Sequence, residues 1–264
     1  MTSDTVYQRL RSHLAYMGLP ASAEVVAEHL DRAQKHKPSY TVFLEALLAV
    51  EVEATSARRL AGRLRFAHFP LLKTLEDFDF DAQPSLDRRL VDDLATLRFV
   101  EEGANLLCVG PPGVGKTHIA LALALKAVEA GYRVYYTTAA DLVARCHRAA
   151  MEGRWATTMR FYAGPGLLVC DELGYLPLPT EASAHIFQVV SRRAELGSST
   201  IITTNRWITE WGEIFGDAMM AAAILDRFLH RSTVLQIDGD SYRMRSHRER
   251  LEKMRKGVAA TTSG

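Results

Sequence analysis

The feature that most constrains this chain is the segment Gly110-Pro-Pro-Gly-Val-Gly-Lys-Thr117, which has the pattern G-x-x-x-x-G-K-[ST]. An apolar run, Asn105 to Val109, precedes it, and an apolar helical run, His118 to Glu129, follows it. A strand, a glycine-rich turn and a helix in this order can wrap a phosphate chain in backbone N–H groups, because glycine allows positive φ angles and close approach of the backbone. The segment therefore predicts a phosphate-binding loop within an α/β fold.

The loop also predicts how a nucleoside triphosphate is held. Lys116 would place its ammonium on the β- and γ-phosphates, Thr117 would offer its hydroxyl to Mg²⁺, and the following helix would direct its N-terminal dipole at the anion. A chance match in a glycine-rich loop is the alternative, and the flanking strand and helix argue against it. The predicted ATP-binding residues of this stretch are Gly110, Pro111, Pro112, Gly113, Val114, Gly115, Lys116, Thr117 and His118.

The composition limits what else the chain can be. Its 264 residues, 48% of them hydrophobic, suffice for one large domain or a medium one with a small appendage. Since the net charge is only +1, binding to nucleic acid would have to come from local basic patches. The three cysteines lack metal-ligand spacing, and we see neither a signal peptide nor a membrane-spanning run, so we expect a cytoplasmic protein without a membrane partner.

The N-terminal residues 1–68 predict a small all-α domain. Apolar residues recur three and four positions apart in four predicted helices, Thr5 to Gly18, Ser22 to Lys35, Tyr40 to Glu53 and Ser56 to Arg65. The last of these carries four arginines with no nearby acid, and a basic helix can either contact DNA or present a solvated face. The candidate DNA contacts here are Arg58, Arg59 and Arg63.

The rest of the chain predicts a parallel sheet. A stretch with few helical signals, Phe66 to Pro84, is interpreted as a linker or lead-in strand, and Ser85 could cap a helix over Leu86 to Phe99. Short apolar strands then alternate with helices, and five such strands indicate a sheet covered on both faces. The predicted strands are Asn105–Val109, Arg133–Thr138, Leu167–Glu172, Thr200–Thr204 and Val234–Ile237. This domain would occupy residues 69–248, followed by a basic tail over 249–264.

Polar side chains end two of these strands. Asp171 and Glu172 follow four apolar residues, and ligands of open α/β sheets bind at the carboxyl ends of the strands. Asp171 would hold Mg²⁺, directly or through water, and Glu172 would deprotonate the water that attacks the γ-phosphate. Asn205 would hydrogen-bond that water or the γ-phosphate, although an ordinary turn residue is an equally good interpretation. The set favours ATP hydrolysis over ATP binding alone.

With Lys116, Asp171, Glu172 and Asn205 taken together, the chain resembles an AAA+ ATPase. More narrowly it resembles the IstB-like helper ATPases of insertion sequences and, more distantly, the DnaC-type helicase loaders. The resemblance covers nearly the whole chain and is carried by Arg65–Pro70, Gly110–Ala120, Asp171–Pro177, Thr204–Asn205, Trp211–Asp217, Ile224–His230 and Gly239–Arg243. It implies a five-stranded sheet in the order 5-1-4-3-2, and a ring or helical homo-oligomer with ATP at the subunit interfaces.

The resemblance also implies roles for arginines. Arg227 matches an arginine finger that acts on the neighbouring subunit's ATP, with a surface salt bridge to Asp226 as the alternative, and Arg243 matches a second sensor that contacts ATP. The helices Ala140 to Met151 and Arg154 to Tyr162 resemble the extra element by which initiator-type AAA+ proteins line a DNA channel. Phosphate contacts, or a solvated face, are then expected at Arg145, Arg148, Arg154 and Arg160.

These features lead to a functional hypothesis with two rivals. We expect an ATP-dependent helper that assembles on double-stranded DNA and stimulates a cognate transposase, with hydrolysis resetting the assembly. A DnaC-type loader, whose N-terminal domain would bind a replicative helicase, stays open. So does a nucleotide-switched binding module in which turnover is incidental, although Glu172 argues against it.

Overall fold

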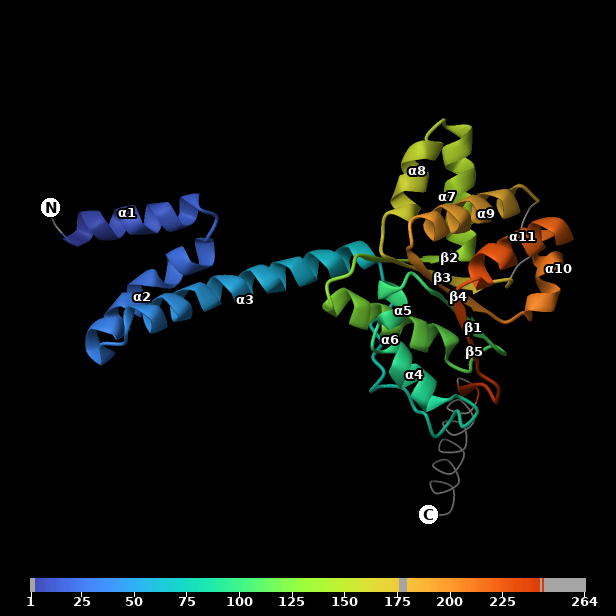
Figure 1. The fold of residues 1–264 in the computed structure, drawn as a ribbon, viewed down its shortest axis with the longest axis horizontal. Helices are drawn as coiled ribbons and strands as arrows, with labels where there is room; N and C mark the ends of the chain where they lie inside the picture. The colour runs from blue at the N-terminus through green and yellow to red at the C-terminus, as the bar shows by residue number, and fades with distance from the viewer. Residues whose placement is uncertain (1–2, 176–179, 243, 245–264) are drawn as a thin grey trace, which may run out of the picture. The chain divides into compact units, whose positions relative to one another are not determined.

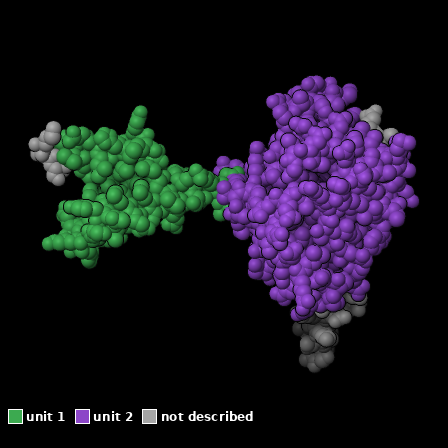
Figure 2. Space-filling view, in the orientation of Figure 1, with its two compact units in different colours: residues 1–62 green, residues 63–264 purple. Residues whose placement is uncertain are grey.

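The computed structural model of the chain describes residues 3–175, 180–242 and 244. The chain forms two compact units, residues 1–62 and residues 63–264 (Figure 2). None of the described helices combines the length and the apolar character that crossing a membrane requires. Arg243 and the predicted tail over 249–264 lie outside the described residues, and the predicted domain limits at 68 and 248 stay predictions.

The first unit is helical, as its apolar spacing predicts. It comprises α1 (Ser3–Tyr16), α2 (Pro20–His36) and the first part of α3 (Tyr40–Ala67). Its small core consists of Leu14, Ala23, Val26 and Leu47. Ser22 is buried inside α2, where its hydroxyl donates to the carbonyl oxygen of Leu47 at 2.9 Å, so a polar contact joins α2 to α3.

One helix replaces the two that were expected between Tyr40 and Arg65. The prediction of a break after Glu53 is wrong, because α3 runs without interruption from Tyr40 to Ala67. The intervening residues, Ala54 and Thr55, include neither proline nor glycine, so nothing in the backbone chemistry stops the helix there. The hydroxyl of Thr55 also donates to Glu51 Oε1 at 3.4 Å, one turn earlier on the same helix.

The second unit contains a five-stranded parallel sheet. Its strands are β1 (Asn105–Val109), β2 (Val134–Thr138), β3 (Leu167–Leu173), β4 (Ser199–Thr204) and β5 (Ser232–Gln236). They lie in the order β2-β3-β4-β1-β5, and every pair is parallel, which confirms the expected order 5-1-4-3-2. All five residues of β1 are buried, as a central strand covered on both faces requires.

Helices cover both faces of this sheet (Figure 1). One face carries α6 (Lys116–Glu129), the helix that follows the glycine-rich loop. The other face carries α7 (Ala139–Met151), α9 (Thr180–Glu195) and α11 (Ala218–Leu229), with α8 (Trp155–Ala163) packed against α7. Two short helices, η1 (Ile208–Glu210) and α10 (Trp211–Phe215), connect β4 to α11. The carboxyl ends of the strands are thus left open at one edge of the sheet.

The segment ahead of β1 differs from its prediction. Residues 68–87 contain neither a strand nor a helix, so of the two interpretations the lead-in strand is wrong and the linker fits. The helix expected over Leu86 to Phe99 is two short helices, α4 (Arg88–Leu94) and α5 (Arg98–Glu101). Asp87, not Ser85, caps α4, because its carboxylate accepts from the backbone N–H groups of Arg89 and Leu90. The hydroxyl of Ser85 accepts instead from the backbone N–H of Asp238 at 3.0 Å.

A buried arginine fastens the helices to the sheet. Arg193, near the end of α9, is only 1% exposed. Its guanidinium donates to the carbonyl oxygens of Tyr162 and Pro165 at 2.8 and 3.0 Å, to Thr200 Oγ1 at 2.9 Å, and to the carbonyl of Ser199. Burial lowers the pKa of Arg193 to about 9. One side chain thus joins α9, the end of α8 and the start of β4.

We predict that Arg193→Met lowers the free energy of unfolding by about 3 kcal/mol, because methionine replaces the apolar stem of arginine but leaves buried carbonyl acceptors without a donor. Urea unfolding followed by far-UV circular dichroism measures the change. The matched control is Arg192→Met, an exposed neighbour on α9 paired with Glu195, which should change stability by less than about 0.5 kcal/mol. Equal losses in the two variants would contradict the anchoring role.

Candidate functional site

The glycine-rich loop joins β1 to α6 in the geometry that its sequence predicts. Gly115, the residue before the first residue of α6, has φ +104°, and a Cβ there would lie 2.5 Å from a ring carbon of Phe78. At Gly110 a Cβ would lie 2.0 Å from the carbonyl oxygen of Ile237. Both positions therefore require glycine for space as well as for conformation. Residues of the loop and the N-terminus of α6 line one cavity, and the backbone N–H groups of such a loop and helix start suit an anion.

The end of this loop and several other predicted site residues line one cavity of about 480 Å³. Lys116 is only 8% exposed, and its ammonium donates to the carbonyl oxygens of Gly110 and Pro111 at 2.7 and 2.8 Å. These carbonyls hold the charge at the loop, where phosphates would lie. The cavity is also lined by Thr117, His118, Glu172 and Asn205.

Asp171 does not line this cavity, but it is hydrogen-bonded to two residues that do, Thr117 and Thr203. It is 2% exposed. Its Oδ1 accepts from the hydroxyls of Thr117, at 2.9 Å, and Thr203, and its Oδ2 accepts from the Tyr136 hydroxyl at 2.8 Å. Three hydroxyl donors from α6, β4 and β2 therefore converge on one buried carboxylate.

The surroundings of Asp171 keep neighbouring groups protonated. Burial, followed by the charge of Asp171, raises the pKa of Tyr136 well above its ordinary value, so its phenol remains a hydrogen-bond donor. The same causes raise the pKa values of the Cys108 and Cys170 thiols to about 12. Both cysteines are buried in strands, as expected of Cys acting as a small apolar residue, and their thiols stay protonated.

Glu172 is turned away from Asp171 by an irregularity in β3. The pairing of β3 with β4 shifts register between Cys170 and Leu173, and Glu172 has φ +62°, an unusual value for a residue other than glycine. Its backbone N–H donates to Thr203 Oγ1 at 3.0 Å, which holds this conformation. Asp171 is consequently buried while Glu172 is exposed to the cavity, and strained backbone of this kind is common at functional sites.

The remaining atoms of the site fit a nucleotide with a metal ion. Asn205 Oδ1 is buried and, among the described residues, has no hydrogen-bond partner, as expected of an atom meant for a ligand or water. Within the described residues no three His, Cys, Asp or Glu side chains could hold an ion by themselves. Mg²⁺ bound with ATP needs no such cluster, because a hydroxyl, a carboxylate and phosphate oxygens suffice. Thr117 and Asp171 would supply the first two.

The segment between Ala67 and α4 supplies a wall of the cavity that the sequence did not reveal. Leu71, Lys73 and Phe78 line it, and the Phe78 ring meets the His118 ring edge-on at 5.2 Å between centroids. His118 Nε2 also lies 2.8 Å from the carbonyl oxygen of Thr74, which ties this segment to α6. The only sequence signal was a pair of phenylalanines, Phe78 and Phe80, within an acidic run.

Arg227 is not part of this cavity. It is exposed in the last turn of α11, and no ion pair joins it to Asp226 or to another acid of the described residues. The alternative of a salt bridge therefore finds no support in this part of the chain. Its role, and that of Arg243, stay predictions.

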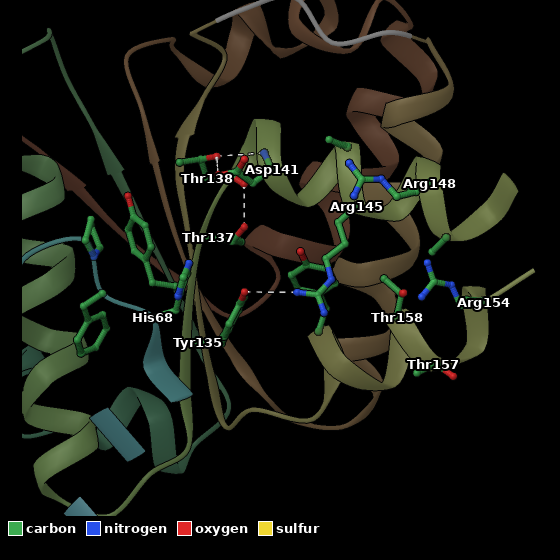
Figure 3. A pocket seen from close by; sticks show the side chains of 16 residues that line it. His68, Tyr135, Thr137, Thr138, Asp141, Arg145, Arg148, Arg154, Thr157 and Thr158 are labelled. Atoms are coloured by element: carbon green, nitrogen blue, oxygen red, sulfur yellow. Dashed lines mark hydrogen bonds between the residues drawn. The ribbon is translucent and has the colours of Figure 1, made fainter. Parts of the chain in front are cut away.

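Three of the four arginines predicted on α7 and α8 line a second cavity, of about 820 Å³, beside β2. Figure 3 shows Arg145 reaching from α7 towards Tyr135, with Arg148 and Arg154 on the side of the cavity formed by α7 and α8. Arg154 pairs with Glu152. Arg160 is exposed on α8, outside this lining.

The basic part of α3 is less free than its sequence suggested. The expectation that its arginines have no nearby acid is wrong for Arg58, because its guanidinium contacts Glu51 Oε1 at 2.9 Å, two turns earlier on α3. Arg63 Nε donates to the carbonyl oxygen of Val128 at 3.0 Å, at the end of α6. Arg59 is exposed. DNA contact by these three stays a prediction.

Comparisons with known proteins agree with this geometry. The family model described as IstB-like ATP binding protein matches residues 12–250. The chain belongs to that family. It is similar to the putative ATP-binding protein of insertion sequence IS5376 from Geobacillus stearothermophilus, with 39% identity over 94% of this chain and 98% of that protein. It is also similar to that of IS21 from Pseudomonas aeruginosa, with 43% identity over 83% of each chain.

Solved structures support the fold. The DnaC helicase loader is 26% identical, with a TM-score of 0.50 over 56% of this chain and 86% of DnaC. The replication initiator DnaA, solved with AMPPCP and single-stranded DNA, is 21% identical, with a TM-score of 0.52 over 68% of this chain and 54% of DnaA. This IstB-like chain therefore has the AAA+ P-loop fold, and its family, fold and complete phosphate loop make it an ATPase of that class.

We predict that Phe78→Ala raises the dissociation constant for ATP about tenfold, because loss of the ring removes a wall of the cavity and the support of Gly115. Titration with a fluorescent ATP analogue measures the affinity. Phe80→Ala is the control, since Phe80 lies two residues on, packs on Phe78 and does not line the cavity. Equal losses of affinity in the two variants would contradict a specific role for Phe78.

Proposed function

We propose that this IstB-like protein is an ATP-dependent helper of transposition, which assembles on double-stranded DNA, hydrolyses ATP and stimulates a cognate transposase. The observation that carries the proposal is the presence, in one unit, of a cavity that joins the phosphate loop to Glu172 and Asn205 and of a separate cavity lined by arginines. The named relatives, which are ATP-binding proteins of insertion sequences, supply the biological setting.

ATP and its metal are assigned to residues of this chain as follows. The loop amides and the Lys116 ammonium bind the β- and γ-phosphates, while the Thr117 hydroxyl and the Asp171 carboxylate hold Mg²⁺. The ion, when bound, neutralises charge that develops on the phosphate oxygens. The Phe78 and Leu71 side chains close the cavity on its apolar side.

The hydrolytic step is assigned to Glu172 and Asn205. Glu172 projects into the cavity, so its carboxylate can accept the proton of the attacking water. Asn205 Oδ1, which lacks a partner among the described residues, can accept a hydrogen bond from the same water and orient it. This pairing favours turnover over a nucleotide switch without hydrolysis.

Assembly is assigned to the outer side of α11. Arg227 is exposed there, and Met219 on the same helix is 83% exposed, so a cation and an apolar side chain both face outward. An arginine that completes a neighbour's ATP site would make hydrolysis depend on contact between subunits. We therefore propose a ring or helical homo-oligomer with ATP at the subunit interfaces.

DNA binding is assigned first to α7 and α8. Arg145, Arg148 and Arg154 offer guanidinium groups around one hollow surface, which suits a phosphate backbone. Arg160, and the α3 arginines Arg58, Arg59 and Arg63, are further candidate contacts. No arrangement for reading base edges is evident in the lining of the described cavity, so the binding is proposed to be insensitive to sequence.

Replacing the proposed base tests the hydrolytic assignment. Glu172→Gln should lower kcat for ATP by at least about 100-fold while keeping ATP affinity within about threefold, because only proton acceptance is lost. Assembly on DNA should persist. Glu213→Gln, at an exposed glutamate of α10, is the control. Turnover at the wild-type rate in Glu172→Gln would remove Glu172 from the mechanism.

Reversing charge tests the DNA surface. The triple variant Arg145→Glu, Arg148→Glu and Arg154→Glu should weaken binding of all duplex sequences by at least about 100-fold. It should also lower the slope of log affinity against log salt concentration by the equivalent of about three phosphate contacts. Fluorescence anisotropy at several salt concentrations measures both. Arg192→Glu, on α9, serves as control. A loss confined to one sequence would instead show base readout.

The biological output is tested with the transposase itself. We expect this protein with ATP to raise insertion of transposon ends into target DNA, and we expect Lys116→Ala to abolish the increase while end cleavage by the transposase continues. A strand-transfer assay in vitro measures both steps. Lys126→Ala, further along α6, controls for loss of a lysine.

A different result would favour the helicase-loader alternative. Transposition would be unchanged, and the protein would instead place a replicative helicase onto single-stranded DNA in an ATP-dependent way. The fold shared with the DnaC helicase loader is the observation that keeps this second function in view. Both assays use the same Lys116→Ala variant, so the two outcomes are directly comparable.

A further inference from the structure

Two consecutive tyrosines of β2 connect the arginine-lined cavity to the buried carboxylate of the ATP site. The Tyr135 hydroxyl accepts a hydrogen bond from Arg145 Nη1 at 3.5 Å, which Figure 3 shows as a dashed line. The Tyr136 hydroxyl donates to Asp171 Oδ2 at 2.8 Å. Since successive side chains of a strand point to opposite faces, one short piece of backbone joins both contacts.

The contacts of Arg145 are of a kind that a phosphate can replace. Its guanidinium carbon lies 4.0 Å from the ring centroid of Phe161, and its hydrogen bond to the Tyr135 hydroxyl, at 3.5 Å, is long and therefore weak. No acid among the described residues forms an ion pair with it. A cation held only by aromatic rings and a phenol gains a stronger, charge-assisted partner when a phosphate arrives.

The strand between these contacts can shift more easily than its neighbours. β2 is at the edge of the sheet and pairs only with β3 in the described part of the chain. Tyr135 packs against Phe161 and against His68, with ring centroids 4.7 and 6.1 Å apart, and of these two His68 lines the cavity together with Tyr135 itself. Tyr136 is 8% exposed and its hydroxyl is bonded to Asp171, so a displacement of its backbone is passed to that carboxylate.

We propose that β2 relays occupancy of the arginine-lined cavity by DNA phosphates to the metal-binding carboxylate, with Tyr136 as the positioning residue for Asp171. This inference rests on the proposed function, since it requires DNA at α7 and α8 and Mg²⁺ at Asp171. A phosphate draws Arg145 away from Tyr135 and Phe161, the edge strand adjusts, and the Tyr136 hydroxyl reorients the carboxylate. DNA thereby sets the affinity of the ATP site for Mg²⁺.

Replacing Tyr136 with phenylalanine tests the relay, because only the hydroxyl is lost. We measure the Mg²⁺ concentration that gives half-maximal binding of a fluorescent, non-hydrolysable ATP analogue, with and without a duplex oligonucleotide. In the wild-type protein, adding DNA should change this Mg²⁺ concentration by at least about fivefold, which is the lower end of the coupling usually found between two binding sites. Tyr136→Phe should show a shift of less than about 1.5-fold while its DNA affinity stays within about twofold of wild type.

Two further variants separate positioning from general damage. Tyr132→Phe removes a phenol that contacts Glu101 just before β2, and it should keep the full shift. Tyr135→Phe removes the hydroxyl that accepts from Arg145, on the face of β2 opposite to Asp171, and should reduce the DNA-dependent shift in the Mg²⁺ requirement. This variant still tests the relay if Tyr136→Phe fails to fold. A wild-type shift in either folded Tyr136→Phe or Tyr135→Phe overturns the relay.

The wild-type protein distinguishes failure of this inference from failure of the proposed function. Binding of both DNA and the ATP analogue with no DNA-dependent change in the Mg²⁺ requirement overturns the relay and leaves the proposed function intact. Absence of binding to DNA overturns both. Sedimentation of the same samples shows that the variants assemble to the same extent, so that a lost shift cannot arise from lost assembly.

Discussion

The structure of the ATP-binding unit depends on satisfying one buried carboxylate. An ionised group taken out of water is costly unless hydrogen bonds replace its hydration. For Asp171 these bonds come from Thr117, Tyr136 and Thr203, which lie on α6, β2 and β4. The carboxylate therefore joins the phosphate loop to the strands on both sides of β3. Packing and site chemistry are coupled here, since loss of any one hydroxyl both weakens a contact and alters the proposed metal ligand.

The same constraint explains why the neighbouring residue is available for chemistry. With Asp171 directed inward, the register shift in β3 and the positive φ of Glu172 turn the next carboxylate into the cavity, where Thr203 supports both residues through one hydroxyl. The two acids thus differ in environment although they are adjacent in sequence. A metal ligand and a proton acceptor need such different surroundings, the first buried and bonded, the second exposed to water.

Sequence patterns predicted the parts of this molecule that follow local rules. The loop, the strands and their order rest on glycine spacing, apolar runs and a family resemblance, and the structure confirms the fold. The helix break after Glu53 was wrong because no residue enforces it, and the cap of α4 was misplaced by two residues, from Ser85 to Asp87. The wall formed by Phe78 and the bond from Tyr136 to Asp171 depend on contacts between distant segments, which periodicity does not encode.

The central claim is that Asp171 and Thr117 hold a divalent ion only together with ATP. Mn²⁺, which takes the same oxygen ligands as Mg²⁺ and is paramagnetic, allows a direct test by electron paramagnetic resonance. The account predicts one Mn²⁺ bound per chain in the presence of a non-hydrolysable ATP analogue, and loss of that signal in Asp171→Asn while binding of the metal-free analogue persists. Equal Mn²⁺ binding by wild type and Asp171→Asn would contradict it.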